Sequence, residues 1–300
     1  MCYTFLGCFI LKIKIMFFKS RRFFTFLFLL LTFLLLVNVG CRDDESTQTS
    51  QEQRAEAFPC REELVDERDE NAYQTVQIGD QCWMQENLRY LPEVIGSDEG
   101  SKEEPYYYVY DYEGTDMVEV KETRHYDTYG VLYNWVAAMD GDESSEEKPS
   151  GVQGVCPDGW HLPSDAQWTE LEIYLAENGY NYDGSESDPS EIDHLKRSKI
   201  GKSLAATKLW EESSDYDRQE GAVGTDLSKN NSSGFTALPA GYRLEVGSFG
   251  FVELYDHWWG ATEDDTDTAF IRELAYYSQG LTKSPRLKDF GYSVRCVSEL

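Results

Sequence analysis

The sequence predicts an α+β fold in which helices and strands occupy separate parts of the chain. The segments with the clearest helical features come first, and from residue 235 to the C-terminus short aromatic and apolar runs follow one another. These runs are separated by Gly241, Gly247, Gly250, Gly260, Gly280 and Gly291. Because helices and strands do not alternate as they do in βαβ units, an antiparallel sheet is expected rather than a parallel one.

The first strand candidates lie near the start of the folded region. Residues 72–78 alternate in the way typical of a half-buried strand, and Gly79 and Asp80 then turn the chain. Residues 81–88 are interpreted as a second strand or as the exit from one. The tyrosine-rich residues 106–112 are interpreted as a strand or an ordered loop.

Two segments carry a helical pattern. In residues 129–139, Leu132, Trp135, Val136 and Met139 recur at helical spacing, which predicts one buried face. The clearest helix begins after Ser164, which is a good N-cap, and Gln167 stands at the capping-box position. Its apolar side carries Trp168, Leu171 and Leu175, with Glu172 among them. Residues 200–210 are ambiguous between helix and strand.

The N-terminal segment is predicted to be a targeting element and not part of the fold. Lys19, Arg21 and Arg22 precede residues 23–37, an unbroken run of apolar residues and threonine. This run is shorter than the ~20 residues that a membrane-spanning helix needs. The sequence NVGC at residues 38–41 resembles the lipobox of bacterial lipoproteins, which implies cleavage before Cys41 and attachment of lipid to its thiol. An uncleaved signal anchor is the alternative, and Met16 is an alternative start to Met1.

Residues 42–57 are polar and lack periodicity, so they are expected to be a flexible tether between residues 1–41, the signal peptide, and residues 58–300, a single domain. The acidic residues at positions 43–45 resemble the surface-export tract that follows the lipidated cysteine in some Gram-negative lipoproteins. The expected location is therefore the outer membrane, with the domain exposed at the cell surface and held to the membrane by its lipid.

The charge of the chain excludes one class of partner. It contains 27 Lys and Arg against 55 Asp and Glu, for a formal net charge of −28, and five of the basic residues but none of the acidic ones precede Cys41. The remainder is therefore strongly acidic and would repel nucleic-acid phosphate. Acidity also keeps an exported protein soluble, and this simpler explanation is favoured.

Four cysteines remain once Cys2, Cys8 and Cys41 are set aside. They are Cys60, Cys82, Cys156 and Cys296, and an even number in an oxidising compartment favours disulfides. Three pairings are open, of which Cys60 with Cys82 and Cys156 with Cys296 are favoured because the first two flank one short unit and the others bracket the rest. A zinc site is disfavoured because no C-x-x-C spacing occurs and the four histidines are scattered.

Seven phrases occur in a fixed order along the chain. They are YQTVQIG (73–79), CWMQENL (82–88), YGVLYNW (129–135), CPDGWHLPS (156–164), SGFTALP (233–239), WWGATE (258–263) and GYSVRCV (291–297). Together they resemble the Fibrobacter succinogenes major paralogous domain, a module of bacterial surface lipoproteins without an established general activity. The resemblance covers roughly residues 60–297.

Residues 161–168 and 291–297 are also similar to segments of formylglycine-generating enzymes and C-type lectin-like domains. This wider resemblance implies a C-type lectin-like fold, which has a twisted antiparallel sheet, two or three flanking helices and long ligand-facing loops. It also implies that residues 291–297 form a core strand. The enzymes in this group hold copper with a pair of nearby reactive cysteines, and the sequence contains no such pair.

The candidate ligand face follows from that fold, in which loops do the recognising. It comprises residues 242–251 and 258–267, with the candidate ligand-binding residues Tyr242, Arg243, His257, Trp258, Trp259 and Glu263. Aromatic faces suit sugar rings. Most tryptophans are nevertheless expected in the core, and a structural salt bridge is the slightly favoured role of Arg243.

Calcium is kept as an alternative ligand, although no cofactor is required by any motif. Oxygen-rich loops suit this ion, and the candidate ligands are Glu263, Asp264, Asp265 and Asp267. A second acidic loop carries Asp183, Glu186, Asp188 and Glu191, and solvated charge is the simpler interpretation of both. The Glu-Pro-Asn motif of calcium-dependent lectins is absent from the sequence.

The sequence therefore favours a non-catalytic surface module that binds a carbohydrate or a protein through its loop face. An enzyme of unknown chemistry is the alternative, and a structural envelope component is the third. His161 and Ser164 are interpreted as structural, because no acid–His–Ser constellation accompanies them. A glycosidase would need two carboxylates at a defined separation, and 55 acidic residues do not single out a pair.

Overall fold

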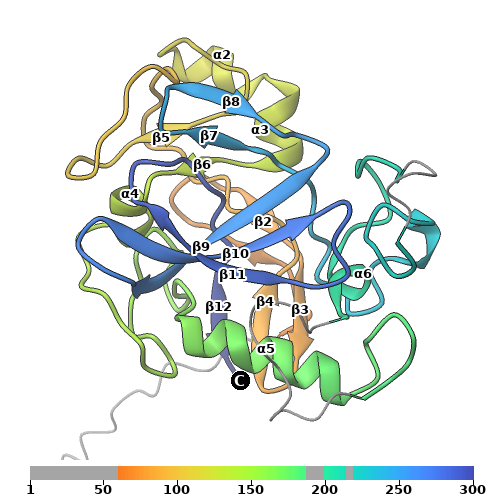
Figure 1. The fold of residues 1–300 in the computed structure, drawn as a ribbon. Coiled ribbons are helices and arrows are strands. Elements are labelled where there is room, and N and C mark those ends of the chain that lie inside the picture. The colour runs from red at the N-terminus through yellow and green to blue at the C-terminus, as the bar shows by residue number, and fades with distance from the viewer. Residues whose placement is uncertain (1–59, 187–198, 214–218) are drawn as a thin grey trace, which may run out of the picture. The chain divides into compact units, whose positions relative to one another are not determined.

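The computed structural model describes residues 60–186, 199–213 and 219–300, which all belong to one compact unit, Arg54–Leu300. The expected signal peptide, Cys41 and the tether lie outside the described residues. The described part is mixed α+β, with several small antiparallel sheets and few helices (Figure 1), so the predicted class is confirmed. None of its helices is both long and apolar enough to cross a membrane.

The helices are short except for one. They are α2 (Met117–Lys121), α3 (Arg124–Tyr129), α4 (Trp135–Met139), α5 (Asp165–Glu177), α6 (Gly201–Leu204) and the 3₁₀ turn η3 (Leu227–Lys229). Helix α5 begins as the sequence predicts, because the Ser164 side chain accepts from the backbone N–H of Gln167 and the Gln167 side chain caps Ser164 in return. Its predicted apolar side is buried.

Residues 129–139 do not form the single helix that their spacing suggests. Helix α3 ends at Tyr129, Gly130 has a positive φ of 82°, and residues Leu132–Tyr133 form a strand. The chain becomes helical again only after Asn134, whose side chain caps α4 by accepting from the N–H of Ala137. A glycine in a left-handed conformation and a local side-chain cap therefore override the apolar period.

The strands pair into five small sheets. The strands are β1 (Leu64–Val65), β2 (Ala72–Tyr73), β3 (Thr75–Ile78), β4 (Gln81–Met84), β5 (Tyr107–Tyr108), β6 (Leu132–Tyr133), β7 (Tyr242–Leu244), β8 (Ser248–Gly250), β9 (Tyr255–Glu263), β10 (Thr268–Ala275), β11 (Thr282–Leu287) and β12 (Val297–Glu299). The longest sheet has the order β11–β10–β9, and another has the order β12–β4–β3. The pairs β1–β2, β5–β6 and β7–β8 are separate hairpins or ladders.

The sheet β11–β10–β9 separates two hydrophobic clusters. Successive side chains of a strand point to opposite faces, so Trp258 belongs to one cluster and the adjacent Trp259 to the other. Helix α5 covers the Trp258 face, where Trp168 lies 5.8 Å from Trp258 and 4.7 Å from Trp83 between ring centroids. The sheet therefore lies inside the domain, and the two hydrophobic clusters cover most of its two faces.

The C-terminal segment is buried in this core, but residues 291–297 do not form the continuous strand that the resemblance implied, because residues 291–293 make only isolated bridges and β12 begins at Val297. Ser293 exchanges hydrogen bonds with β9, because its N–H donates to the His257 carbonyl and its carbonyl accepts from the N–H of Trp259. Strand β12 then pairs antiparallel with β4, with Val297 opposite Trp83. The end of the domain is therefore hydrogen-bonded to one of its first strands.

Both predicted disulfides are confirmed. Cys60 is joined to Cys82, 22 residues apart, and Cys156 to Cys296, 140 residues apart. The longer bridge fastens the segment before α5 to the segment before β12 inside the larger hydrophobic cluster. Closing the longer loop removes more freedom from the unfolded chain, so this bridge contributes the larger share in the loop-entropy picture.

Candidate functional site

Four residues of the predicted ligand face lie in the interior. Trp258 and Trp259 are 0% exposed, Arg243 is 1% exposed and His257 is 2% exposed. The indole N–H of Trp258 donates to Asn87 Oδ1 at 2.9 Å, and that of Trp259 donates to the Tyr133 carbonyl at 2.7 Å. The two tryptophans therefore cannot offer their faces to a ligand, because β9 runs through the core rather than along a loop face.

Arg243 holds three backbone segments together. Its Nε donates to the Ser97 carbonyl and its two terminal nitrogens donate to the carbonyls of Asp289 and Glu99, at 2.7–2.9 Å. The guanidinium also lies 5.0 Å from the ring centroid of Tyr108. Its role is structural, as favoured, although its partners among the described residues are carbonyl oxygens instead of a carboxylate.

The acidic run 263–267 forms the tip of the β9–β10 hairpin. Asp265 accepts from the backbone N–H of both Asp267 and Thr268 at 2.9 Å, which fixes the turn. Glu263 pairs with Lys288, and Asp267 pairs with Lys102. Each of these three carboxylates therefore has different partners. In the described part of the chain, no group of three or more His, Cys, Asp or Glu could hold a metal.

Only part of the second acidic loop lies among the described residues. Asp183 pairs with Lys199, which together with hydrogen bonds from Ser185 lowers the pKa of the carboxyl. Asp188 and Glu191 lie outside the described residues.

Tyr242 belongs to a surface group that the sequence only partly indicated. We call Tyr242, Phe251, Tyr255, Tyr277 and Phe290 the aromatic face. Tyr242 stacks on Phe251 with 5.0 Å between ring centroids and an interplanar angle of 11°, and Phe251 meets Tyr255 edge-on at 5.6 Å. Phe251 and Tyr277 are each 42% exposed. The rings are thus preorganised by one another and open to solvent on one side.

A polar group lies beneath and beside these rings. His257 packs edge-on against Tyr242 at 4.6 Å, and its Nε2 lies 3.0 Å from Oε2 of Glu273, which also accepts from Arg286 at 3.2 Å. Burial lowers the pKa of His257. Burial alone would raise the pKa of Glu273, but His257 and Arg286 lower it. An Arg–Glu pair therefore stands beside the aromatic face with its charges intact.

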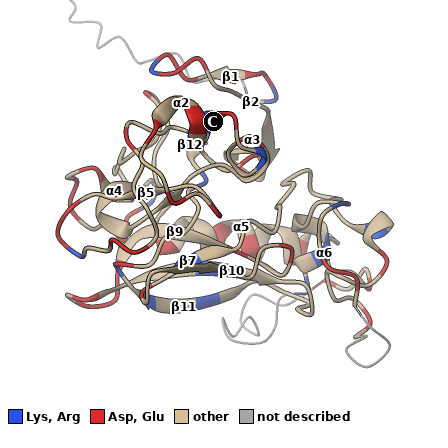
Figure 2. Cartoon of the chain, turned by 90° about the horizontal axis from the view of Figure 1, so that it is seen from above, with Lys and Arg blue, Asp and Glu red and all other residues tan. Residues whose placement is uncertain are grey.

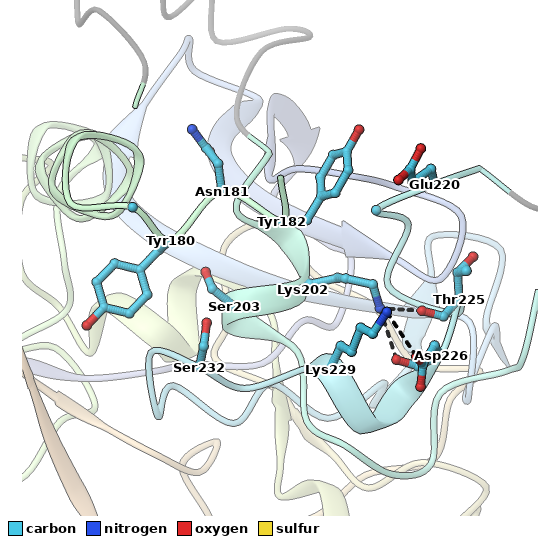
Figure 3. Close-up of a pocket in the computed structure, with 12 residues that line it drawn as sticks. Tyr180, Asn181, Tyr182, Lys202, Ser203, Glu220, Thr225, Asp226, Lys229 and Ser232 are labelled. Carbon is cyan, nitrogen blue, oxygen red and sulfur yellow. Dashed lines mark hydrogen bonds and ion pairs between the residues drawn. The ribbon is translucent and has the colours of Figure 1, made fainter. Parts of the chain in front are cut away.

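A separate cavity of about 240 Å³ opens beside helix α6 (Figure 3). Its wall is formed by residues 179–182 after α5, by Lys202 and Ser203 of α6, and by parts of residues 220–232. No residue of the aromatic face lines it. No motif in the sequence predicts this cavity, because its wall comes from three segments that share no motif.

Comparison with known proteins agrees with the ordered phrases. Residues 76–298 match the sequence model of the Fibrobacter succinogenes major domain. The chain belongs to this family. Searches of curated proteins and of solved structures returned no match.

The matched range of the Fibrobacter succinogenes major domain contains the aromatic face, the cavity and three of the four bonded cysteines, while Cys60 precedes it. All four cysteines of the described region form disulfides. A reactive cysteine pair like that of formylglycine-generating enzymes therefore does not occur in the described part of this domain.

The polar residues of the CPDGWHLPS phrase have structural roles in the Fibrobacter succinogenes major domain. Ser164 caps α5, and His161 Nε2 lies 2.8 Å from Gln167 Nε2. Burial lowers the pKa of His161 to about 4. His161 contacts Gln167, and the Ser164 hydroxyl donates to the Glu147 carbonyl, so the two residues are not paired as base and nucleophile, which agrees with the structural interpretation of both.

Proposed function

We propose that the chain is a non-catalytic, lipid-anchored surface module that binds a carbohydrate through its aromatic face. The observation that carries this proposal is the cluster of contacting rings Tyr242, Phe251, Tyr255 and Tyr277, of which Phe251 and Tyr277 are exposed. Sugar rings have apolar faces and polar edges, so they suit a surface that combines flat rings with hydrogen-bonding groups.

The charges around the aromatic face narrow the type of glycan. Arg286 and Glu273 supply donors and acceptors at the side of the rings, and they neutralise one another. The chain carries 55 Asp and Glu against 27 Lys and Arg, and its acidic residues are spread over many segments (Figure 2), while basic residues are found on β11. A polyanionic glycan would be repelled at long range by such a surface, so a neutral glycan is the preferred ligand.

A protein ligand is the second candidate for the same face. Clusters of exposed aromatic rings are also enriched at protein interfaces, and the side chains of Val246 and Val118 add exposed apolar surface elsewhere, at 74% and 73%. The carbohydrate is favoured because the paired charges of Glu273 and Arg286 act on Tyr242 and so supply hydrogen-bonding groups beside the aromatic face.

We also propose that the fold is C-type lectin-like. The support is the antiparallel sheet β11–β10–β9, the helix α5 packed on one of its faces, and the C-terminal segment that crosses the core to pair with β4. The long connection of residues 140–164 is of the kind expected of that fold.

Removal of the two exposed rings is expected to abolish carbohydrate binding without unfolding the domain. The combined variant Phe251→Ala with Tyr277→Ala should weaken binding at least ~10-fold, since each ring would lose a stacking contact. Soluble protein comprising residues 58–300 is first applied to arrays of neutral glycans and of proteins to identify the ligand. Titration with that ligand then measures the affinity. Tm should change little because both rings are partly exposed.

The matched control is Val246→Ala, which removes an exposed apolar side chain outside the aromatic face. It should leave affinity unchanged. Binding of a protein but of no glycan would replace the carbohydrate proposal with the second candidate. If the ring variant and the original chain bind with equal affinity, the aromatic face is the binding site of neither the carbohydrate nor the protein.

The membrane anchor is tested at Cys41. The variant Cys41→Ala should accumulate as unprocessed precursor and incorporate no labelled fatty acid, because the thiol is the proposed lipid acceptor. Metabolic labelling followed by electrophoresis gives both readouts, and Cys8→Ala, which should behave as the unaltered chain, is the control. Full labelling of the Cys41 variant would refute the lipoprotein assignment. Protease treatment of intact cells then tests surface exposure.

A further inference from the structure

The cavity beside α6 contains a buried cation. The side chain of Lys202 is 6% exposed, and its ammonium donates to the carbonyls of Thr225 and Asp226 and to Asn230 Oδ1, the last at 2.9 Å. Three protons thus meet three oxygens, which fixes the position of the charge at the cavity wall; Figure 3 shows the contacts with Thr225 and Asp226. All three acceptors are neutral.

No carboxylate forms an ion pair with Lys202 among the residues that the structure describes. The carboxylate of Asp226 accepts from Ser228 at 2.6 Å and lies 3.4 Å from the exposed Lys229. Buried charges in proteins are normally paired, because desolvation penalises an isolated one by several kcal/mol. Asp226 acts on Lys202 through its charge and raises the lysine pKa, but it does not lie within ion-pair distance of the ammonium, which is unexpected for a buried lysine in a chain that carries 55 acidic residues.

We propose that the cavity beside α6 binds a small hydroxylated carboxylate, of the size of one sugar acid, whose charge compensates that of Lys202. The cavity is smaller than the ~300–1,000 Å³ of sites for drug-sized ligands, so it suits a single ring. Ser203, Ser232 and Thr225 give its wall hydroxyl groups, and the ring of Tyr182 forms part of one side. This proposal is independent of the aromatic face.

The role of Lys202 gives the binding a pH dependence. Burial lowers the pKa of Lys202 to about 8, and Asp226 and Lys229 act on it in opposite directions. A bound carboxylate favours the charged form, so binding takes up a proton wherever the empty cavity holds neutral lysine. The affinity should stay level below pH 8 and fall by up to ~10-fold per pH unit above it. The other titratable groups that line the cavity are Glu220, Tyr180 and Tyr182.

The test is isothermal titration of the full-length chain in detergent with glucuronate and galacturonate. The neutral sugars glucose and galactose are matched in size, and inorganic phosphate is an anion without the ring. We expect at least one sugar acid to bind ~10-fold or more tightly than its neutral counterpart at pH 7, and to lose that advantage by pH 10. Equal binding of acid and neutral sugar, equal binding of phosphate, or no binding of either sugar acid would overturn the proposal.

Two variants place the ligand in this cavity. Lys202→Met removes the charge and should abolish both the preference for the acid and the pH dependence above 8. Because Lys202 also joins three loop oxygens, that variant could unfold, so Ser232→Phe, which fills the rim from an exposed position and leaves Lys202 intact, is the second test. Ser248→Phe on β8 is the matched control outside the cavity. Undiminished binding to Ser232→Phe would exclude the cavity.

Discussion

The variant Arg272→Met is expected to lower the free energy of unfolding by about 3–5 kcal/mol. Arg272 is 1% exposed on β10, and its Nε donates to Glu172 at 2.6 Å while NH1 donates to Asp165 at 2.8 Å. Both carboxylates come from α5, so the arginine fastens the helix to the sheet. Methionine would remove the ion pair between Arg272 and the buried carboxylate of Glu172, which is 2% exposed.

Denaturant unfolding monitored by tryptophan fluorescence measures this effect. Arg124→Met is the matched control, because Arg124 is exposed and should change stability by less than ~0.5 kcal/mol. Adding Glu172→Leu to Arg272→Met should restore part of the loss, since the buried carboxylate that lost its ion pair with Arg272 is then removed as well. A loss below ~1 kcal/mol for Arg272→Met would show that this network does not hold α5 in place.

The variant Asp256→Asn is expected to gain stability relative to the original chain as the pH rises. Burial raises the pKa of Asp256 from 3.8 to about 7, although Arg295, Asn87 and Ser293 act in the opposite direction. The folded state therefore binds this proton more tightly than the unfolded state. The stability that the protonated group contributes is complete below pH ~4 and is lost as the pH approaches 7.

About three pH units separate the two pKa values of Asp256, which corresponds to a change of up to ~4 kcal/mol. The variant cannot ionise, so the difference in unfolding free energy between variant and original chain should shift by this amount between pH 4 and 7 and then level off. Urea unfolding at intervals of half a pH unit measures it. Asp158→Asn controls for the loss of an exposed carboxylate. A difference that is constant with pH would show that Asp256 is ionised throughout.

The parts of the fold that depend on local chemistry could be predicted from the sequence. The Ser164–Gln167 capping box involves residues three apart, and the cysteine pairing followed from where the four cysteines fall along the chain. The helix expected over residues 129–139 was wrong because its apolar period ignored Gly130 and the capping side chain of Asn134.

The candidate site was predicted only in part, because exposure depends on contacts between distant segments. Trp258 and Trp259 are neighbours on β9, and their burial requires that α5 cover one face of the sheet and the Tyr133–Tyr292 region the other. Phe251 and Tyr277 are exposed for the opposite reason, since nothing among the described residues packs over their outer surfaces. The buried run of WWGAT could have indicated a strand covered on both faces.

The pairing of β12 with β4 determines when this domain can fold. One strand lies among the last residues of the chain and the other begins at Gln81, and Cys156 finds its partner only at position 296. A chain that is still being synthesised or translocated therefore lacks both the strand that pairs with β4 and the cysteine that bonds to Cys156. Contacts between such distant segments form slowly. For a chain exported as proposed, delayed folding is an advantage, since the polypeptide stays extended until its last residues have passed through the membrane.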